Sequence, residues 1–222
     1  MELIQIDPAH LLEACADQYH VDHWQDQQHR AELWVEKDAL LGVVEPICQR
    51  WDCPFFSCRG YPSVSELHEA AKRIKRYKKK GQDFKLLYCG DHDPSGLNMG
   101  DAITRTLKEF GADVTFERIA LNIEQIRRFN PPPNPVKKSD RRAKGYRQLY
   151  GDDCWELDAL PPEALNEIIE TAIINCIDDM GVFERRRTED LEGRERLRLV
   201  GDHFDEVCRH VEVLRYGDDD DE

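Results

Sequence analysis

The sequence predicts an α/β fold in which a four-stranded parallel sheet is flanked by helices and followed by a mostly helical C-terminal extension. Three observations lead to this prediction. Strand-like and helix-like patterns alternate four times between about residues 31 and 121, as in parallel sheets with helices on both faces. The stretch "DFKLLYCGD" at 83–91 is apolar through its middle, as a strand covered on both faces should be. Beyond residue 121 the pattern changes to helices and a proline-rich connection.

The first half of the chain alternates regularly between helix and strand. The predicted order is a helical lead-in at 1–30, a strand at 33–35, a helix at about 38–51, a strand within 53–60, a helix at 64–80, a strand at 83–91, a helix at 94–112 and a strand at 113–121. Ser63 and Glu66 have the spacing of a capping box, and Gly81 and Gly111 stand where helices commonly end. Pro46 lies inside the second predicted helix, which it would kink or shorten.

The second half predicts three helices and one basic loop. Asn122 begins a short helix in "NIEQIRRFN", and "PPPNPVKKSDRRAKGY" at 131–146 predicts a basic connection that is extended at its start. The stretch "LPPEALNEIIETAIINCID" at 160–178 is amphipathic and predicts a helix that starts near Pro161 and Pro162. We expect another long polar helix over about 184–214.

Acidic residues stand where two of the predicted strands end. Glu36 ends the first strand, and Asp91 and Asp93 end the third. Residues i and i+2 of an extended chain point to the same side, so Asp91 and Asp93 can converge, and Glu36 faces the same point if the two strands are neighbours. Carboxylates so close repel each other, and a divalent cation removes that repulsion. A ligand set of oxygens alone favours Mg²⁺ or Mn²⁺ over zinc.

Two of these residues also have a simpler interpretation. Asp93 followed by Pro94 is a good helix start, with aspartate as the N-cap and proline in the first turn. Lys37 either contacts a phosphate or is a solvated lysine beside a glutamate. The metal hypothesis therefore depends on the combination of Glu36, Gly60 and the aspartate pair in this strand order.

That combination resembles the signature of a Toprim domain, the fold shared by topoisomerases, bacterial primases and several nucleases. The stretches "LWVEKDAL", "SCRGYPS" and "YCGDHDPSG" are similar to those of the topoisomerase VI A subunit and its meiotic double-strand-break relatives. The similarity covers residues 31–121 strongly and continues weakly through "YGDDCWELDALPP". It implies a Toprim-like (Rossmann-like) sheet and domain boundaries at 1–30 (lead-in), 31–125 (Toprim domain), 126–217 (helical extension with the basic loop) and 218–222 (acidic tail).

The resemblance implies that Glu36, Asp91 and Asp93 hold Mg²⁺ and that these acids with Lys37 form a catalytic site for DNA cleavage. Glu156 would place a second ion, although a helix-stabilising or solvated role fits it better. Only about 30 residues precede the first predicted strand, too few for the winged-helix domain that carries the catalytic tyrosine of topoisomerase VI. We therefore expect hydrolysis, as in Toprim nucleases, or a module that works with an upstream domain or a protein partner. A non-catalytic module that binds DNA or a partner protein is the alternative.

Charge is distributed unevenly along the chain. The formal net charge of −14 argues against a polyanionic partner, but five of the negative charges are in the tail at 218–222, and two segments at 72–80 and 137–147 are strongly basic. The predicted DNA contacts are in the second basic segment, at Lys137, Lys138, Arg141, Arg142 and Lys144, which would neutralise phosphates without reading sequence; a solvated loop is the alternative. For 72–80 we favour an ordinary lysine-rich helix end.

Other classes of protein fit the sequence poorly. No apolar run approaches the roughly 18 residues of a membrane span, and the first residues lack the features of an export signal, so we expect a cytoplasmic protein. The eight cysteines are scattered without a C-x₂-C pair, which is unlike a zinc site or a disulfide framework. The sequence gives no indication of the oligomeric state.

Overall fold

The computed structural model describes residues 7–137 and 140–217. Within them the contacts define two compact units, a sheet unit at Asp26–Asp179 and a helical unit formed by residues 7–25 and 180–217. The expected boundaries differ from this division, because residues 126–179 belong to the same unit as the sheet. The physical reason is that the helix predicted at 160–178 packs against the fourth strand and the second helix.

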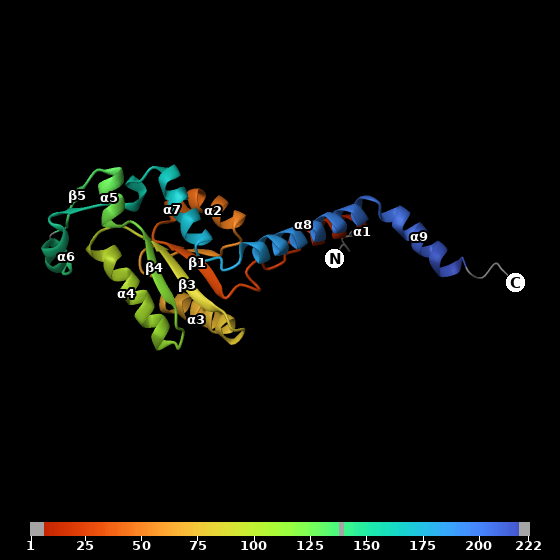
Figure 1. Ribbon diagram of the computed structural model, residues 1–222, viewed down its shortest axis with the longest axis horizontal. Helices are drawn as coiled ribbons and strands as arrows, with labels where there is room; N and C mark the ends of the chain where they lie inside the picture. Colours follow the sequence, from red (N-terminus) through yellow and green to blue (C-terminus); the bar gives the residue numbers. More distant parts are fainter. Residues whose placement is uncertain (1–6, 138–139, 218–222) are drawn as a thin grey trace, which may run out of the picture. The chain divides into compact units, whose positions relative to one another are not determined.

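The sheet unit contains a four-stranded parallel sheet in the order β2-β1-β3-β4 (Figure 1), which confirms the predicted fold class. The strands are β1 (His29–Val35), β2 (Phe55–Ser57), β3 (Asp83–Cys89) and β4 (Thr115–Ala120). The two inner strands, β1 and β3, pair over their whole length from His29↔Asp83 to Val35↔Cys89. Their carboxyl ends therefore lie side by side.

Helices cover both faces of this sheet. The connections contain a 3₁₀ turn (Asp38–Leu40), α2 (Leu41–Arg50), α3 (Val64–Lys79), α4 (Pro94–Glu109), α5 (Ile123–Phe129), α6 (Ala143–Tyr150), a second 3₁₀ turn (Leu157–Ala159) and α7 (Pro162–Ile174). The pair α3 and α4 packs on one face, and α2 packs with α7 on the other (Figure 1). A two-stranded antiparallel ladder joins β5 (Asn134–Pro135) to β6 (Asp153–Cys154).

Local signals in the sequence account for several helix ends. Ser63 and Glu66 form the expected capping box at the start of α3, and Asn122 caps α5 together with Gln125. Pro46 lies inside α2 without ending it. The segment that we expected to be a loop up to residue 146 is partly helical, because α6 begins at Ala143; burial of Ala143 and Tyr146 stabilises this short helix.

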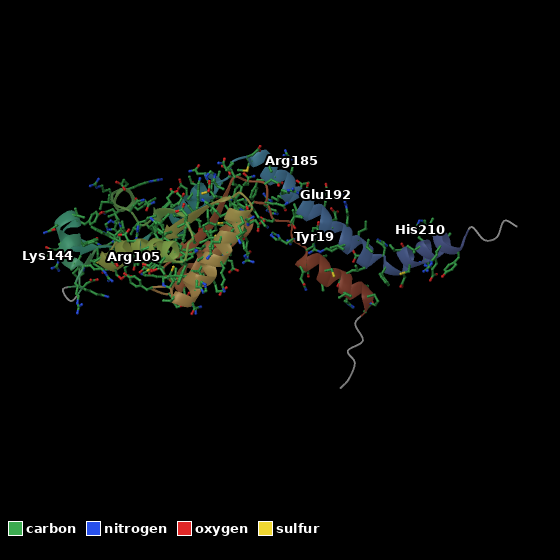
Figure 2. All side chains as sticks on the ribbon, turned by 90° about the horizontal axis from the view of Figure 1, so that it is seen from below. Tyr19, Arg105, Lys144, Arg185, Glu192 and His210 are labelled. Atoms are coloured by element: carbon green, nitrogen blue, oxygen red, sulfur yellow. The ribbon has the colours of Figure 1, made fainter. Side chains whose placement is uncertain are left out.

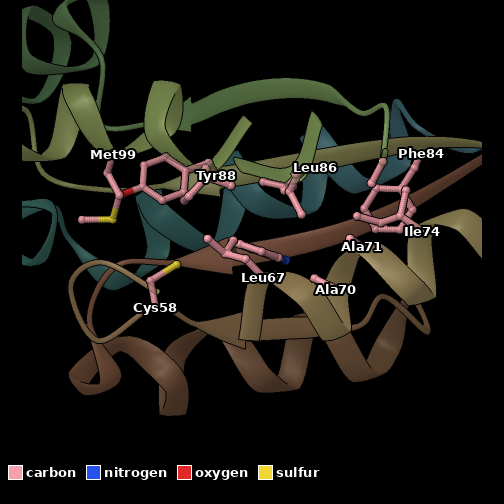
Figure 3. Packing of buried hydrophobic residues seen from close by; sticks show 13 residues of the cluster. Cys58, Leu67, Ala70, Ala71, Ile74, Phe84, Leu86, Tyr88 and Met99 are labelled. Carbon is pink, nitrogen blue, oxygen red and sulfur yellow. The ribbon is translucent and has the colours of Figure 1, made fainter. Parts of the chain in front are cut away.

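The core between the sheet and the pair α3 and α4 is apolar. Leu86 and Tyr88 of β3 point toward Leu67 and Ile74 of α3 and toward Met99 of α4, and all five side chains are buried (Figure 3). At roughly 25 cal/mol per Å² of apolar area removed from water, side chains of this size each contribute on the order of 2 kcal/mol. This packing fixes β3, and with it the acidic segment that follows the strand.

One ion pair is buried beside this core. Glu32 of β1 is 2% exposed, and its carboxylate accepts two hydrogen bonds from the Arg73 guanidinium, at 3.0 and 2.6 Å, and one from Trp34 Nε1 at 2.9 Å. A buried carboxylate needs such partners because its desolvation is costly. The pair therefore fixes how α3 lies on the sheet.

The helical unit consists of α1 (Pro8–Gln18), α8 (Met180–Asp202) and α9 (Phe204–Tyr216). Asp190 of α8 is buried and accepts a hydrogen bond from the backbone of Val21. We expected one helix over 184–214, but the structure has two, which separate at His203. Gly201 precedes the break and lies close to α1, where an added Cβ would be 3.4 Å from Ala9 O; glycine is also a weak helix former.

None of the helices in the described part of the chain has the length and apolar character that crossing a membrane requires.

Candidate functional site

The predicted acidic residues gather at the carboxyl edge of the sheet. Glu36 directly follows β1, and its backbone N–H donates to Cys89 O at the end of β3 (2.9 Å). Asp91 and Asp93 lie in the short connection from β3 to α4. The first and third predicted strands are neighbours, so the condition for Glu36 to face the aspartate pair is met. This adjacency is what brings Glu36 next to the aspartate pair.

Glu36 is held by the segment that carries the aspartates. Its Oε2 accepts a hydrogen bond from the N–H of Asp91 (2.8 Å) and a long one from the Tyr88 hydroxyl (3.4 Å). Glycines make room for this carboxylate, since an added Cβ would lie 2.7 Å from Oε2 at Gly90 and 3.1 Å from it at Gly96. The glycines of "YCGDHDPSG" therefore form a cradle for the glutamate.

The two aspartates are fixed in different ways. Asp91 is buried, and its Oδ1 accepts a hydrogen bond from Leu157 N (2.8 Å) and lies 3.2 Å from Lys37 Nζ. Asp93 is the N-cap of α4, with Oδ1 accepting from Gly96 N at 2.6 Å. Asp93 thus has the structural role of a cap, and its partly exposed carboxylate remains at the same edge as Glu36 and Asp91.

The electrostatics of the site reflect crowded carboxylates. Burial, followed by the negative charge of Asp91, raises the pKa of Glu36 above its usual value. Burial also raises the pKa of Asp91, although the Leu157 amide and Lys37 oppose this shift. Asp93 adds to the repulsion on both groups. A positive charge placed among these carboxylates would therefore be bound favourably.

Lys37 supplies one such charge. Its ammonium lies 3.2 Å from Asp91 Oδ1, 3.1 Å from Glu156 Oε2 and 3.0 Å from Asp158 Oδ1. Burial opposes the charge on Lys37, but the surrounding carboxylates outweigh this effect and raise its pKa above the usual value. Lys37 is therefore not the freely solvated lysine of the simpler interpretation, because it is paired with three carboxylates.

Asp158 was not among the residues predicted from the sequence. Glu156 and Asp158 belong to "WELDAL": Glu156 directly precedes the second 3₁₀ turn, Asp158 lies within it, and both residues are exposed. Their two-residue spacing repeats that of Asp91 and Asp93, which is the signal that could have indicated Asp158. Both side chains reach the site through Lys37.

Arg118 of β4 fixes the acidic segment by hydrogen bonds to its backbone. Its guanidinium donates to the carbonyl oxygens of Gly90 (2.8 Å), Asp91 (3.2 Å), Leu121 (3.3 Å) and Gly96 (2.5 Å). Burial lowers the pKa of this guanidinium, and its charge is compensated by carbonyl dipoles and by the nearby acids. No sequence pattern indicated this role, because it depends on how β4 pairs with β3.

His92, between the two aspartates, connects the site to α6. Its ring is buried, and its Nδ1 lies 2.9 Å from the Tyr146 hydroxyl, which donates to His92 O at 2.9 Å. Tyr150 and Trp155 pack edge-on against the imidazole. Burial lowers the pKa of His92 and so disfavours the protonated ring. These contacts anchor α6 beside the acidic segment.

The predicted DNA-contact residues flank this anchor. Lys137, Arg141, Arg142 and Lys144 are exposed, and Lys144 extends from α6 (Figure 2), whereas Lys138 lies outside the described residues. The Arg142 guanidinium lies over the ring of Tyr61, 5.5 Å from its centroid. Tyr61 in turn donates to Asn98 Oδ1 of α4 at 3.1 Å. The basic segment is thus held next to the loop after β2 and the start of α4.

The arrangement of the carboxylates and their chemistry point in different directions on metal binding. In residues 7–137 and 140–217, no group of three or more His, Cys, Asp or Glu side chains is arranged to hold an ion. The chemistry of the donors nevertheless suits Mg²⁺, since all three are carboxylates, and Glu36 and Asp91 have raised pKa values. The hydrogen bonds described above all fall on one oxygen of each group.

Comparison of the chain with protein-family models, with curated proteins and with solved structures gives no match.

Proposed function

We propose that this chain cleaves phosphodiester bonds of DNA with Mg²⁺ or Mn²⁺, either as a hydrolytic nuclease or as the metal-binding module of a topoisomerase VI-like cleavage protein. One observation carries the proposal: Glu36 and Asp91 lie together at the carboxyl edge of two neighbouring central strands, where the backbone N–H of Asp91 donates to Glu36 Oε2 at 2.8 Å. The carboxyl edge is where open α/β sheets bind ligands. The resemblance of the three motifs to a Toprim domain supports the same conclusion.

In this proposal the acids bind the metal ion and Lys37 contacts the phosphate. Glu36, Asp91 and Asp93 would hold the ion, and the ion when bound supplies positive charge that offsets the charge developing on the phosphate. Lys37, which already lies among carboxylates, would turn toward the phosphate once the ion compensates Asp91. In hydrolysis, the oxygen of a water forms the new bond to phosphorus, the bond to the leaving sugar oxygen breaks, and a proton passes to that oxygen.

Positioning of the substrate would fall to the basic segment. Arg141, Arg142 and Lys144 are exposed in and before α6, which His92 of the acidic segment contacts through Tyr146. There they would neutralise phosphates of DNA without contacting bases. This arrangement supports cleavage without sequence preference.

A non-catalytic module is the second candidate, and one observation favours it. The Lys37 ammonium already pairs with Asp91, Glu156 and Asp158, so the protein alone offsets part of the negative charge at this edge. A chain of this kind would bind DNA or a protein partner without cleaving DNA.

Plasmid nicking separates the two candidates. Supercoiled plasmid is incubated with the wild type in Mg²⁺ or Mn²⁺, and relaxed and linear products are quantified. The proposal predicts cleavage that chelation abolishes and that the Glu36→Gln, Asp91→Asn double variant lacks. A matched control, Asp101→Asn with Glu109→Gln, changes the charge equally at exposed positions of α4 and should cleave like the wild type.

If the wild type and the double variant leave equal amounts of supercoiled plasmid, the hydrolytic form of the proposal is wrong.

A further inference from the structure

Basic side chains are concentrated on the second half of α3. The segment at 72–80 contains seven of them: Lys72, Arg73, Lys75, Arg76, Lys78, Lys79 and Lys80. The part that we call the α3 basic face consists of Lys72, Lys75, Arg76, Lys79 and Lys80. The first four of these residues, together with Glu69, line a shallow hollow of about 560 Å³. The helix therefore presents a wide cationic surface.

The protein itself neutralises only some of these charges. Arg73 pairs with Glu32, Lys72 with Glu69 and Lys78 with Asp83, and Lys75 donates to the Phe110 carbonyl at the end of α4.

Arg76, Lys79 and Lys80, by contrast, have no carboxylate within ion-pair distance in the part of the chain that the structure describes, and all three are exposed. An exposed cation without a partner costs the fold little, but three within five residues repel each other. The helix dipole at this end of α3 offsets part of the repulsion, and a bound anion would relieve the rest.

The negative net charge of the chain does not oppose such binding. The sheet unit, Asp26–Asp179, contains 26 acidic and 23 basic residues, whereas the ends of the chain that form the helical unit contain 19 acidic and 8 basic residues. The excess of negative charge therefore belongs mainly to the other unit. Within the sheet unit the two signs nearly balance, so a local positive surface can dominate nearby because fields are screened beyond about 10 Å.

We propose that the α3 basic face binds the phosphate backbone of double-stranded DNA. Lys72 and Lys79 are seven residues apart, about 10 Å along the helix axis. A duplex carries one charge per roughly 1.7 Å, so about six phosphate charges fall within this length. The contacts would be to phosphates and would add affinity without reading sequence. The choice of DNA as the polyanion rests on the proposed function.

A membrane surface is a poorer match for this helix. Helices that bind membranes insert apolar side chains between lipids, but Leu67, Ala71 and Ile74 of α3 are buried. Val64 is exposed, but it is the first residue of α3, at the opposite end of the helix from Lys79 and Lys80. The half of α3 that carries the basic face therefore offers charge without a large exposed apolar side chain.

The α3 basic face lies away from the acidic edge. Lys78 pairs with Asp83, the first residue of β3, so this end of α3 lies at the amino edge of the sheet, opposite Glu36 and Asp91. A duplex bound here contacts the protein outside the candidate active site. This separation allows DNA binding and DNA cleavage to be tested independently.

The test measures duplex binding without metal. Fluorescence anisotropy of a labelled duplex is recorded in EDTA at about 50 to 200 mM salt, for the wild type and for Arg76→Gln, Lys79→Gln, Lys80→Gln. These three residues have no ion pair to lose, and thermal unfolding verifies that the variant folds. A matched control, Arg185→Gln, Arg209→Gln, Arg215→Gln, removes the same charge from exposed positions of α8 and α9.

We expect the α3 variant to bind at least tenfold more weakly, with a salt dependence whose slope is smaller by about 2.7, because each phosphate contact contributes about 0.9. The control should keep the wild-type slope. An unchanged slope in the α3 variant, an equal loss in the control, or tighter binding to phosphatidylserine vesicles than to the duplex would overturn the inference.

The outcome is separable from that of the proposed function. A chain that binds the duplex through α3 but cleaves no plasmid keeps this inference and removes the nuclease proposal. If the wild type cleaves plasmid but the α3 variant keeps the wild-type salt slope, the nuclease proposal stands and this inference is wrong.

Discussion

Arg118 is connected to Glu36 through a single peptide group. The carbonyl of Gly90 accepts a hydrogen bond from Arg118 Nη1 at 2.8 Å, and the N–H of the same peptide, on Asp91, donates to Glu36 Oε2 at 2.8 Å. Hydrogen bonds in such a chain polarise one another. The guanidinium thus strengthens the donor that holds the glutamate, although the two side chains make no direct contact in the described hydrogen bonds.

Replacing Arg118 should weaken this hold. Arg118→Gln removes a charge that lowers the pKa of Glu36, so that pKa should rise further. Mg²⁺ binding requires the ionised carboxylate, and its pH midpoint should therefore move to higher pH with a loss of affinity at neutral pH. Calorimetric titration of Mg²⁺ over a pH series measures both. The control Arg127→Gln, at an exposed position of α5, should leave the pH midpoint of Mg²⁺ binding unchanged. An unchanged midpoint in Arg118→Gln would contradict the proposed link between Arg118 and Glu36.

Glu36→Gln should stabilise the protein in EDTA. The raised pKa of Glu36 means that the folded state binds a proton more tightly than the unfolded state does, so stability is lost as pH rises from 4.5, the usual value of the group, through its raised value. Glutamine keeps an acceptor for the Asp91 amide and has no charge. In urea unfolding between acid and neutral pH, the free energy of unfolding of the variant should increase relative to that of the wild type as pH rises. The exposed Glu195→Gln should show no such trend.

The same experiment with Mg²⁺ tests the ion. Bound at 100 times its dissociation constant, a ligand stabilises by about 2.7 kcal/mol. We expect added Mg²⁺ to reverse the order of stability, so that the wild type exceeds Glu36→Gln. Equal effects of Mg²⁺ on the two proteins would show that Glu36 does not contribute to binding.

Lys37→Met should change metal affinity and cleavage in opposite directions. The ammonium lies 3.2 Å from Asp91 Oδ1 and competes with a cation for that carboxylate, so its removal should tighten Mg²⁺ binding. If Lys37 contacts the phosphate, cleavage slows. Mg²⁺ titration and plasmid nicking are compared with Lys108→Met, an exposed lysine of α4, which should change neither quantity. Slower cleavage together with weaker Mg²⁺ binding would instead mark Lys37 as a structural residue of the site.

Asp93→Asn separates the two roles of this residue. Asparagine caps helices about as well as aspartate, whereas alanine costs about 1 kcal/mol. Asp93→Asn should therefore keep the unfolding free energy of the wild type and lose metal-dependent cleavage, while Asp93→Ala should lose both. Wild-type cleavage by the asparagine variant would restrict Asp93 to the cap that it forms with Gly96 N.

Arg73→Met should destabilise the fold without involving the acidic edge. It leaves the buried carboxylate of Glu32 without its bidentate partner, and breaking a buried pair costs about 3 kcal/mol. Lys72→Met, which removes only an exposed pair with Glu69, should cost about 0.5 kcal/mol or less. Urea unfolding of the two variants gives the comparison. Equal losses would mean that the Glu32 pair contributes no more than a surface pair.

The sequence predicted best what local pattern determines. Alternation of apolar stretches indicated the order of strands and helices, and the placement of Glu36 and the aspartates at strand ends follows from that order. The capping box at Ser63 depends on residues three positions apart and was equally visible. These features need no knowledge of distant contacts.

Features that depend on tertiary pairing were missed. Arg118 reaches Gly90 only because β4 pairs with β3, and Asp158 reaches Lys37 across more than a hundred residues of chain. The break between α8 and α9 comes shortly after Gly201, and Gly201 lies where α8 approaches α1 closely. The site was predicted as three carboxylates and Lys37, whereas the ion pairs of Lys37 and the position of Arg118 became apparent only in the folded chain.

The position of β1 and β3 inside the sheet limits how the acidic site can respond to a ligand. Each strand is hydrogen-bonded on both sides, so their amides should be among the slowest in the sheet unit to exchange with deuterium. The backbone below Glu36 and Asp91 is therefore a stiff frame, and any adjustment on loading must come from rotation of side chains. Affinity for a cation would then be set by rotamer energies of the acids and of Lys37, rather than by closure of a mobile lid.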